Sequence, residues 1–406
     1  MRRYVRGFPL LLLAISLGTL FAAKRAQTTP LWAARTGNLC GQCHFDPNGG
    51  GPRNDYGFMF ARNRHSIEPE GETSPWKDLD LTNRIGDRMP VYIGLNQRFM
   101  LLTNTTSQSD SLDRFGFFAM ENSIHLTFQP HDRLALVYSR DAFSSGSSGG
   151  VDQKEAFGKI TLPGSAYVKA GRFRNPFGLR MDDHTVATRN GYLDFGSGDR
   201  FLPYDPRNPD MGVELGGERG PLYGRLAFTN GPANVFSGGF AETKSVKVGY
   251  HNGHYQGGLS FYDAYLKNPA AGLKRATRWG YYGLGNYGQF VVIGEIAAGT
   301  DEAEPLVVGS ISGDKTNLLA GFGEVDFAAG RTVNFRARYD YLNPNHSSND
   351  ALRAANQHQR YALEGEWVPV PFAELRCAVR RIDHDDEVAY GSKDETQFYT
   401  QVHFSY

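Results

Sequence analysis

Cysteine, long apolar segments and net charge are all scarce in this chain of 406 residues. Its three cysteines, Cys40, Cys43 and Cys377, are too few for a disulfide framework. The 43 basic and 43 acidic residues balance, so the composition gives no support for binding nucleic acid. After residue 23 no apolar run is long enough for a transmembrane helix. These features argue against a disulfide-rich scaffold, a nucleic-acid-binding protein and a helical membrane domain.

The N-terminus has the three parts of a secretory signal peptide. Three arginines among the first six residues precede an apolar run from Phe8 to Phe21, which ends at Ala22 and Ala23. Basic, apolar and small residues in this order are typical of a cleaved signal. The alternative is an uncleaved anchor, for which the run is short. We therefore expect residues 1–23 to be a signal peptide and the mature chain to be exported.

The strongest motif is Cys40-Gly41-Gln42-Cys43-His44. Cys-x-x-Cys-His is the attachment signature of a c-type haem, in which both thiols bond to the haem and the histidine ligates its iron. A bare Cys-x-x-Cys can also be a redox dithiol or half of a zinc site. A zinc site needs further ligands nearby, and Cys377 is far away in the sequence. In an exported chain the motif predicts one covalent haem c, with His44 as proximal ligand of the haem iron.

Two residues downstream are candidates for the second axial ligand. Residues 45–68 begin with the loop Gly49-Gly50-Gly51-Pro52 and continue as a short predicted helix from Asn54 to Arg64, whose first residue is a suitable N-cap. Met59 lies in this helix and His65 follows it. Histidine would give the haem a lower reduction potential and methionine a higher one. Because His65 could also be a surface residue, and Met59 could simply pack among aromatic residues, the sixth position stays open.

From residue 89 onward the sequence alternates with period two. In the last segment, Phe398, Val402 and Phe404 share one face, and Gln401 and His403 share the other. Throughout this region one face is densely charged and the other is rich in aromatic residues. A soluble sandwich also alternates, but a charged face opposite an aromatic face is typical of a transmembrane β-barrel. We therefore expect the apolar face to contact lipid and the polar face to line a lumen.

Sixteen segments carry this pattern: 89–104, 115–130, 134–143, 154–162, 166–173, 211–218, 221–230, 244–251, 254–264, 277–287, 289–299, 316–328, 332–342, 359–369, 372–383 and 395–406. Short turns, such as the hairpin signal Asn252-Gly253, alternate with long polar loops. The predicted fold is all-β, a transmembrane antiparallel barrel of about 16 strands. We expect a haem module at 24–68, a linker at 69–88 and an outer-membrane barrel at 89–406, with the haem module at the periplasmic side or in the lumen.

The longest loop, from Arg174 to Asp210, suits a segment folded into the pore as a constriction. It contains Asp182, Asp183 and His184, whose carboxylates and imidazole suit a first-row metal ion such as Fe(II). The alternative is a loop that caps its own turns and pairs these acids with Arg180 and Arg189. Cys377 lies on the apolar phase of its strand, and we expect it to face lipid.

The segment around the haem motif carries a second pattern. Pro30, Ala33, Ala34 and Arg35 precede Cys40, and Asn54-x-x-Gly57-x-x-Phe60-x-x-Asn63 follows it. Together with one haem motif and one barrel in a single chain, these residues resemble the fused monohaem cytochrome–porin family, which includes outer-membrane iron(II)-oxidase-like cytochromes. The chain departs from the family pattern in three places: it lacks a leucine before Asn54, its loop is lengthened by Gly49 to Gly51, and Arg64-His65 replaces Gly-Tyr.

The resemblance implies electron transfer at the outer membrane. The haem would accept electrons from extracellular Fe(II), and a periplasmic c-type cytochrome or another acceptor would take them, which would make the protein an iron(II):cytochrome c oxidoreductase. Two other hypotheses belong to different classes: a haem-gated porin for small solutes, and a barrel that encloses a separate multihaem conduit. A lumen filled by bulky side chains would favour electron transfer, whereas measurable conductance would favour solute transport.

Overall fold

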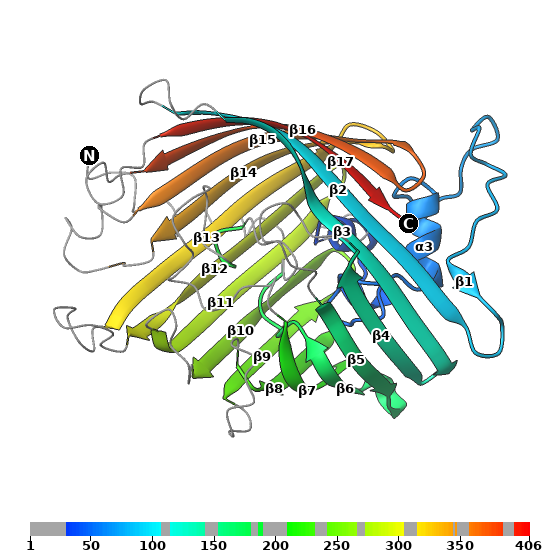
Figure 1. Ribbon diagram of the computed structural model, residues 1–406, viewed down its shortest axis with the longest axis horizontal. Helices are drawn as coiled ribbons and strands as arrows, with labels where there is room; N and C mark the ends of the chain where they lie inside the picture. Colours follow the sequence, from blue (N-terminus) through cyan, green and yellow to red (C-terminus); the bar gives the residue numbers. More distant parts are fainter. Residues whose placement is uncertain are drawn as a thin grey trace.

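Sixteen antiparallel strands close into a barrel (Figure 1). The computed structural model describes residues 30–106, 114–142, 153–179, 186–189, 209–231, 242–265, 273–303, 315–343, 346, 357–384 and 394–406. Each strand from β2 to β17 pairs with the next, and β17 closes the ring by pairing with β2 from Glu395 opposite Thr106 to Ser405 opposite Asn96. The strands are β2 (Val91–Thr106), β3 (Arg114–His131), β4 (Leu134–Asp141), β5 (Gln153–Thr161), β6 (Tyr167–Phe173), β7 (Asp210–Arg219), β8 (Leu222–Thr229), β9 (Thr243–His251), β10 (Tyr255–Tyr265), β11 (Leu273–Tyr287), β12 (Phe290–Ala303), β13 (Lys315–Ala328), β14 (Val333–Asn343), β15 (His358–Val370), β16 (Ala373–His384) and β17 (Glu395–Ser405).

The predicted strands are therefore confirmed one by one, with shifts of a few residues at their ends. The short strand β1 (Arg84–Ile85), which lies in the expected linker, was not predicted. It pairs with β2 at Val91 and Tyr92, beyond the point where β17 ends. β1 thus extends the ladder on an edge of β2 that would otherwise expose unpaired backbone groups.

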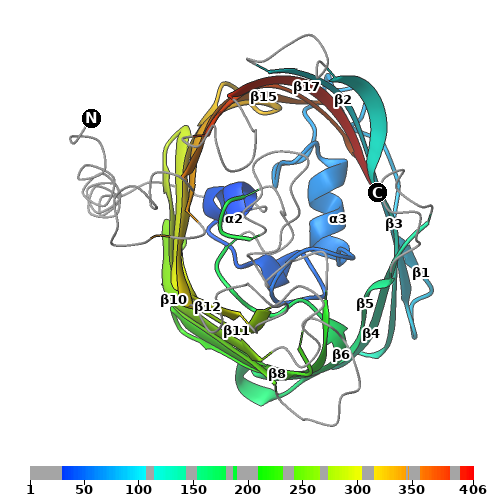
Figure 2. The ribbon, with the colours of Figure 1, turned by 60° about the vertical axis from the view of Figure 1, so that its left-hand side comes forward.

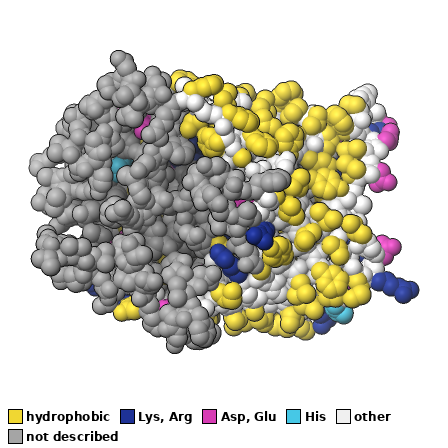
Figure 3. All heavy atoms as spheres, in the orientation of Figure 1, with side chains coloured by type: hydrophobic (Ala, Val, Ile, Leu, Met, Phe, Trp, Pro, Cys, Tyr) yellow, Lys and Arg dark blue, Asp and Glu magenta, His cyan; other side chains and the backbone are white. Residues whose placement is uncertain are grey.

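The two faces of the sheet have opposite chemistry, as alternation predicts. In β14, Phe335 is 53% exposed on the outside, whereas Arg336 and Arg338 are buried on the inside. Apolar side chains cover the visible outer face of the described strands, and charged side chains gather at one rim (Figure 3). Cys377 is exposed on the outer face, as expected. An apolar exterior around a polar interior is the arrangement of a barrel that spans lipid.

No helix in the described ranges is long and apolar enough to cross a membrane.

Residues 30–65, called the plug below, fold inside the ring of strands, where Figure 2 shows both of its α-helices. The plug contains α2 (Pro30–Thr36), the 3₁₀ turn η1 (Cys40–Gln42) and α3 (Asp55–Arg62). It lies at the end of the barrel where short connections join the strands, such as η2 (Pro163–Ser165) and the Asn252-Gly253 turn. A Cβ added to Gly37, just after α2, would overlap the backbone of Gly253 in that turn. The segment expected to form the haem module therefore lies in the lumen, at the short-turn end of the barrel.

Local sequence explains α3. The side chain of Asn54 accepts a hydrogen bond from the backbone N–H of Gly57 at 3.0 Å, which satisfies a free amide at the helix start. At the other end, His65 N–H donates to the Phe60 carbonyl and Arg64 N–H to the Ala61 carbonyl. This is a Schellman motif in which Arg64, at φ 53°, holds the left-handed position usually given to glycine. The helix predicted from Asn54 to Arg64 is confirmed.

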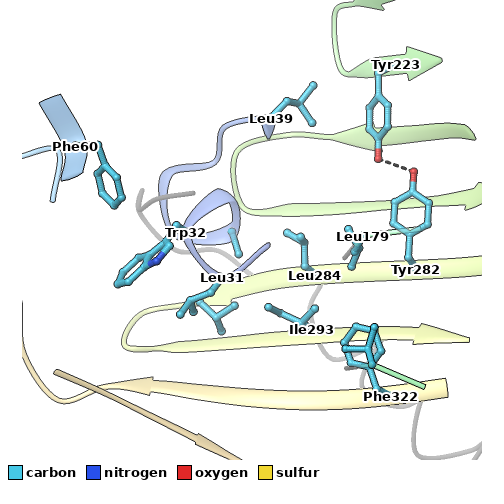
Figure 4. Close-up of a cluster of buried hydrophobic side chains, with 13 residues drawn as sticks. Leu31, Trp32, Leu39, Phe60, Leu179, Tyr223, Tyr282, Leu284, Ile293 and Phe322 are labelled. Carbon is cyan, nitrogen blue, oxygen red and sulfur yellow. Dashed lines mark hydrogen bonds between the residues drawn. The ribbon is translucent and has the colours of Figure 1, made fainter. Parts of the chain in front are cut away.

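An apolar core joins the plug to the barrel wall (Figure 4). Leu31 and Trp32 from α2 pack with wall residues that point into the lumen, including Leu284 on β11, Ile293 on β12 and Phe322 on β13. These wall side chains depart from the polar-inside rule because the plug covers them. A fully buried side chain of this size contributes roughly 1.5–3 kcal/mol, so the core holds the plug against the wall.

Candidate haem site

The haem motif forms one tight turn at the centre of the plug. Backbone N–H groups of Cys43 and His44 both donate to the Cys40 carbonyl, at 3.1 and 3.2 Å. This turn holds the two thiols one turn apart, with His44 directly after the second. Cys43 is buried, Cys40 and His44 are half-buried, and neither cysteine forms a disulfide. The sequence-predicted attachment residues are therefore brought together as the chemistry requires.

Glycines set the space around both thiols. A Cβ added to Gly49 would lie 2.9 Å from Cys40 Cβ and 3.3 Å from its sulfur. A Cβ added to Gly57 in α3 would overlap the Cys43 carbonyl. Chain segments on two sides thus approach the motif at glycine positions, and a larger residue would crowd the Cys40 thiol at Gly49 and the Cys43 backbone at Gly57. With two reduced thiols, an adjacent imidazole and this cradle, the residues present fit a covalent haem.

The loop that follows the motif is clamped by charged side chains of the wall. Lys169 Nζ on β6 lies 3.1 Å from both carboxylate oxygens of Asp46 and 3.0 Å from Glu214 on β7. The side-chain amide of Asn48 donates to Glu214 at 2.9 Å, and Arg225 on β8 donates to the Pro47 carbonyl at 2.8 Å. Burial alone would raise the pKa of Asp46, but the Lys169 ammonium outweighs it and holds this pKa below its ordinary value. Asp46 is therefore a carboxylate, paired inside the barrel.

His65 lies at the end of α3, buried between aromatic rings. Its imidazole stacks on Phe60 with centroids 5.2 Å apart and meets the edge of Trp32 at 5.1 Å. Burial lowers the pKa of His65 to about 3, against the opposing effect of the Glu374 carboxylate. The ring is thus neutral at neutral pH, which is the form that binds a metal. Its ligand atom lies within 4.8 Å of carboxylate oxygens on Glu366 and Glu374, at the wall.

Met59, the other candidate for the sixth ligand, is half-buried in α3. Its neighbour Phe58 does not face the motif but packs on Phe372 and Tyr406 at the short-turn rim, with ring centroids 5.0 and 5.2 Å apart. Aromatic residues of α3 thus serve partly as anchors to the wall. The assignment of His65 or Met59 as second axial ligand stays a prediction.

The long loop after β6 enters the lumen, as predicted. In its described parts, 174–179 and 186–189, Arg189 pairs with Glu295 on β12 at 2.5 Å and Lys247 on β9 donates to the Gly178 carbonyl at 2.5 Å. Leu179 and Val186 join the same apolar core as the plug. Asp182, Asp183 and His184 lie outside the described residues. The loop therefore narrows the lumen and contacts the core that holds the plug, while its metal-binding role stays a prediction.

Several residues that complete the site could not be selected from the sequence. Lys169, Glu214 and Arg225 sit on the polar phase of their strands, where charged residues are ordinary. One pattern does carry a signal: Val291, Val292 and Ile293 are apolar on both phases of β12. A strand that is apolar on both faces is covered on both faces, which indicates a filled lumen at this position.

Comparisons with known proteins address the fold alone. No protein-family model and no curated sequence matches the chain. Among solved structures, the anion-selective porin from Comamonas acidovorans is 10% identical, with a TM-score of 0.60, over 78% of this chain and 100% of that one. The outer membrane channel DcaP of Acinetobacter baumannii is 13% identical, with a TM-score of 0.57, over 78% of this chain and 97% of that one. Salmonella typhi OmpF, in complex with daunomycin, is 10% identical, with a TM-score of 0.55, over 80% of this chain and 100% of that one.

The fold is that of the outer-membrane porins. With its apolar exterior, the barrel is a bacterial outer-membrane protein whose outer face contacts lipid. About a fifth of the chain lies outside the matched region, since the porins cover 78–80% of it. The matched length is that of whole porins, so the plug is additional to a complete barrel.

Proposed function

We propose that this protein transfers electrons at the outer membrane through a haem c attached to Cys40 and Cys43 in the plug. The observation that carries the proposal is the fixed position of the haem motif within the barrel. A soluble cytochrome tethered to a pore would need no contacts with the pore wall. Here the segment that carries the motif is hydrogen-bonded to the wall on both sides of the motif, at Ala34 and Arg35 before it and from Phe45 to Asp55 after it.

These contacts reach strands around the ring. Plug side chains or carbonyls are hydrogen-bonded to Tyr92 (β2), Lys159 (β5), Lys169 (β6), Glu214 (β7), Arg225 (β8), Asn286 (β11), Asn334 (β14) and Ser405 (β17). A hydrogen bond contributes about 1 kcal/mol net, and more where one partner is charged. Together they support a plug that stays in place while the haem is oxidised and reduced.

A bound haem would supply a one-electron acceptor and donor, with its potential set by axial ligation and burial. The chain's own residues would position it: His44 would offer its imidazole to the iron, and the clamped loop after it restricts movement of the motif. Because one haem cannot span the membrane, donor and acceptor must approach it from opposite ends of the lumen. The short-turn end suits a periplasmic cytochrome, and the loop end suits an extracellular donor.

We infer Fe(II) as the donor from the family resemblance, with chemistry in support. Each Fe(II) gives one electron, and Fe(III) precipitates at neutral pH, so oxidation at the cell surface keeps the product out of the periplasm. The test is stopped-flow mixing of the oxidised holoprotein with Fe(II) while the haem α-band is followed. A Cys40→Ser, Cys43→Ser variant, which cannot attach haem, is the matched control. No reduction at any pH would overturn Fe(II) as donor and leave the barrel assignment intact.

Solute transport is the second candidate, and the fold favours it, because the similar structures are described as a porin and a channel. In that case the plug would act as a gate. Single-channel recording of the reconstituted protein separates the two: a stable open conductance favours transport, and a closed barrel with a reducible haem favours electron transfer. The plug and the lumen loop fill space that an enclosed multihaem conduit would need, which counts against that alternative.

A further inference from the structure

Plug and wall meet at a cluster of three potential metal ligands. One ligand atom each from His65, Glu366 on β15 and Glu374 on β16 lies within 4.8 Å of the others. All three residues are at least nine-tenths buried, at 9%, 5% and 7% exposure. Zinc-type ions bind nitrogen and oxygen at about 2.0–2.2 Å, which places ligand atoms roughly 3–4 Å apart. Small side-chain rotations would bring the three atoms to that spacing.

The imidazole provides a second observation. Nδ1 of His65 is buried and has no hydrogen-bond partner among the residues that the structure describes. A buried polar atom without a partner costs about 1–3 kcal/mol. The stacked Phe60 and the edge of Trp32 hold the ring beside the two carboxylates rather than in solvent. Backbone geometry adds to this, because His65 itself has a left-handed φ of 60°.

Each carboxylate keeps an oxygen available for an ion. Arg376 donates to Oε2 of Glu366 at 3.0 Å and to Oε1 of Glu374 at 2.8 Å. Of the other two oxygens, Glu366 Oε1 accepts one hydrogen bond from Asn334 at 3.2 Å, and Glu374 Oε2 lies 3.9 Å from Nδ1 of His403. A carboxylate oxygen has two lone pairs. Arg336 also approaches Oε2 of Glu366, at 3.8 Å, so both guanidinium groups lie against that oxygen and Oε1 is the one that would face an ion.

We propose that His65, Glu366 and Glu374 bind a divalent transition-metal ion that ties the plug to the barrel wall. One imidazole and two carboxylates suit Zn(II), Fe(II) or Mn(II). His403, which faces Glu374 from β17, brings a second imidazole to the same carboxylate. The site is separate from Asp182, Asp183 and His184, and it uses His65 for this ion in place of the haem iron. It goes beyond electron transfer, because a solute-conducting barrel with the same plug would also contain it.

Zn(II) is the probe, because it is redox-inert and its binding does not depend on electron transfer. Isothermal titration of the full-length holoprotein in detergent, freed of metal by a chelator, should show one Zn(II) per chain. His65→Gln and Glu374→Gln should each weaken binding at least about tenfold, with the haem spectrum unchanged. Asp301→Asn is the matched control, since it neutralises a buried wall carboxylate that pairs with Arg278, away from the cluster. Folding of each variant is checked by the heat-dependent gel mobility of the barrel.

Two results would overturn the site. If the Zn(II) affinity is unchanged in both cluster variants, the titrated metal is an adventitious ion only. If His65→Gln changes the haem spectrum but not the Zn(II) affinity, His65 is a ligand of the haem iron and not of this site. X-ray absorption of Zn(II) bound to the wild-type protein keeps the proposal testable if a variant does not fold. We expect nitrogen and oxygen ligands including an imidazole, whereas a sulfur ligand would place the ion at a cysteine and contradict the assignment.

Discussion

Replacing Lys169 by methionine should release the plug. Its ammonium is fully buried between Asp46 of the plug and Glu214 of the wall, and it lies 4.4 Å from the centre of the Phe173 ring. Methionine keeps most of the side-chain volume but leaves two buried carboxylates without their shared cation. Removing one partner of a buried ion pair costs about 3–5 kcal/mol.

The loss of this ion pair should mainly destabilise the closed state, in which the plug is inside the barrel. When the plug leaves, Asp46 reaches water and Glu214 is exposed to the hydrated lumen, so both charges regain solvation. At about 1.4 kcal/mol per factor of ten, the ratio of open to closed barrels should rise by a few hundred- to a few thousand-fold. The assay is single-channel recording of the refolded protein in planar bilayers, combined with limited proteolysis of the plug.

Two further variants sharpen the test. Asp46→Asn and Glu214→Gln in the Lys169→Met background remove the unpaired charges and should restore closure. Lys315→Met serves as control, because Lys315 is 64% exposed and pairs with Glu302 at the loop end of β13. If Lys169→Met conducts no more than wild type and its plug resists protease equally well, the pairing of Lys169 with Asp46 and Glu214 does not hold the plug in place.

Two more predictions concern the same end of the barrel. Gly57→Ala should push α3 away from the Cys43 carbonyl and destabilise the plug by about 1–3 kcal/mol. The haem content per barrel, measured by absorbance, should fall as a result. Gly71→Ala is the control and should leave the haem content unchanged, because a Cβ added there has no atom within 4 Å. The bidentate hydrogen bond from Arg64 holds the pKa of Glu70 below its ordinary value. This contribution, about 1 kcal/mol, is complete above the ordinary carboxyl pKa of about 4.3 and is lost as the pH falls through the lowered value. Acid should therefore expose the linker to an acid protease before the barrel unfolds. In Glu70→Gln the linker should be equally accessible to the protease at neutral and at acid pH. If acid increased cleavage of the linker equally in wild type and Glu70→Gln, the ion pair would not be the cause.

The barrel could be predicted because lipid on one face and water on the other impose a pattern on residues that are neighbours in the sequence. Lipid outside and water inside force alternation along each strand, as in Phe335, Arg336 and Ala337, and this pattern is readable without knowing any partner. The residues proposed to attach haem could also be selected from the sequence, because Cys40, Cys43 and His44 lie within a single turn. In both cases the interacting residues are neighbours in sequence.

The contacts that fix the plug have no such signature. Asp46 and Lys169 are 123 positions apart, and Arg35 reaches Asn334 across 299 positions. His65 shows the same limit: in the sequence it stands in a basic run, but the fold buries it beside Glu366 and Glu374. A charged residue on the luminal phase of a strand looks the same whether it meets water or a plug.

Reduction of a trapped acceptor tests whether electrons cross the barrel through the plug. Proteoliposomes would contain a soluble c-type cytochrome inside, and a membrane-impermeant Fe(II) complex would be added outside. The protein would be inserted with its long loops facing out. We expect the trapped cytochrome to be reduced in vesicles with the wild-type holoprotein and not in vesicles with the Cys40→Ser, Cys43→Ser variant, while conductance stays low in both. Equal rates of reduction in the two kinds of vesicle would show that electrons do not pass through a haem in the plug.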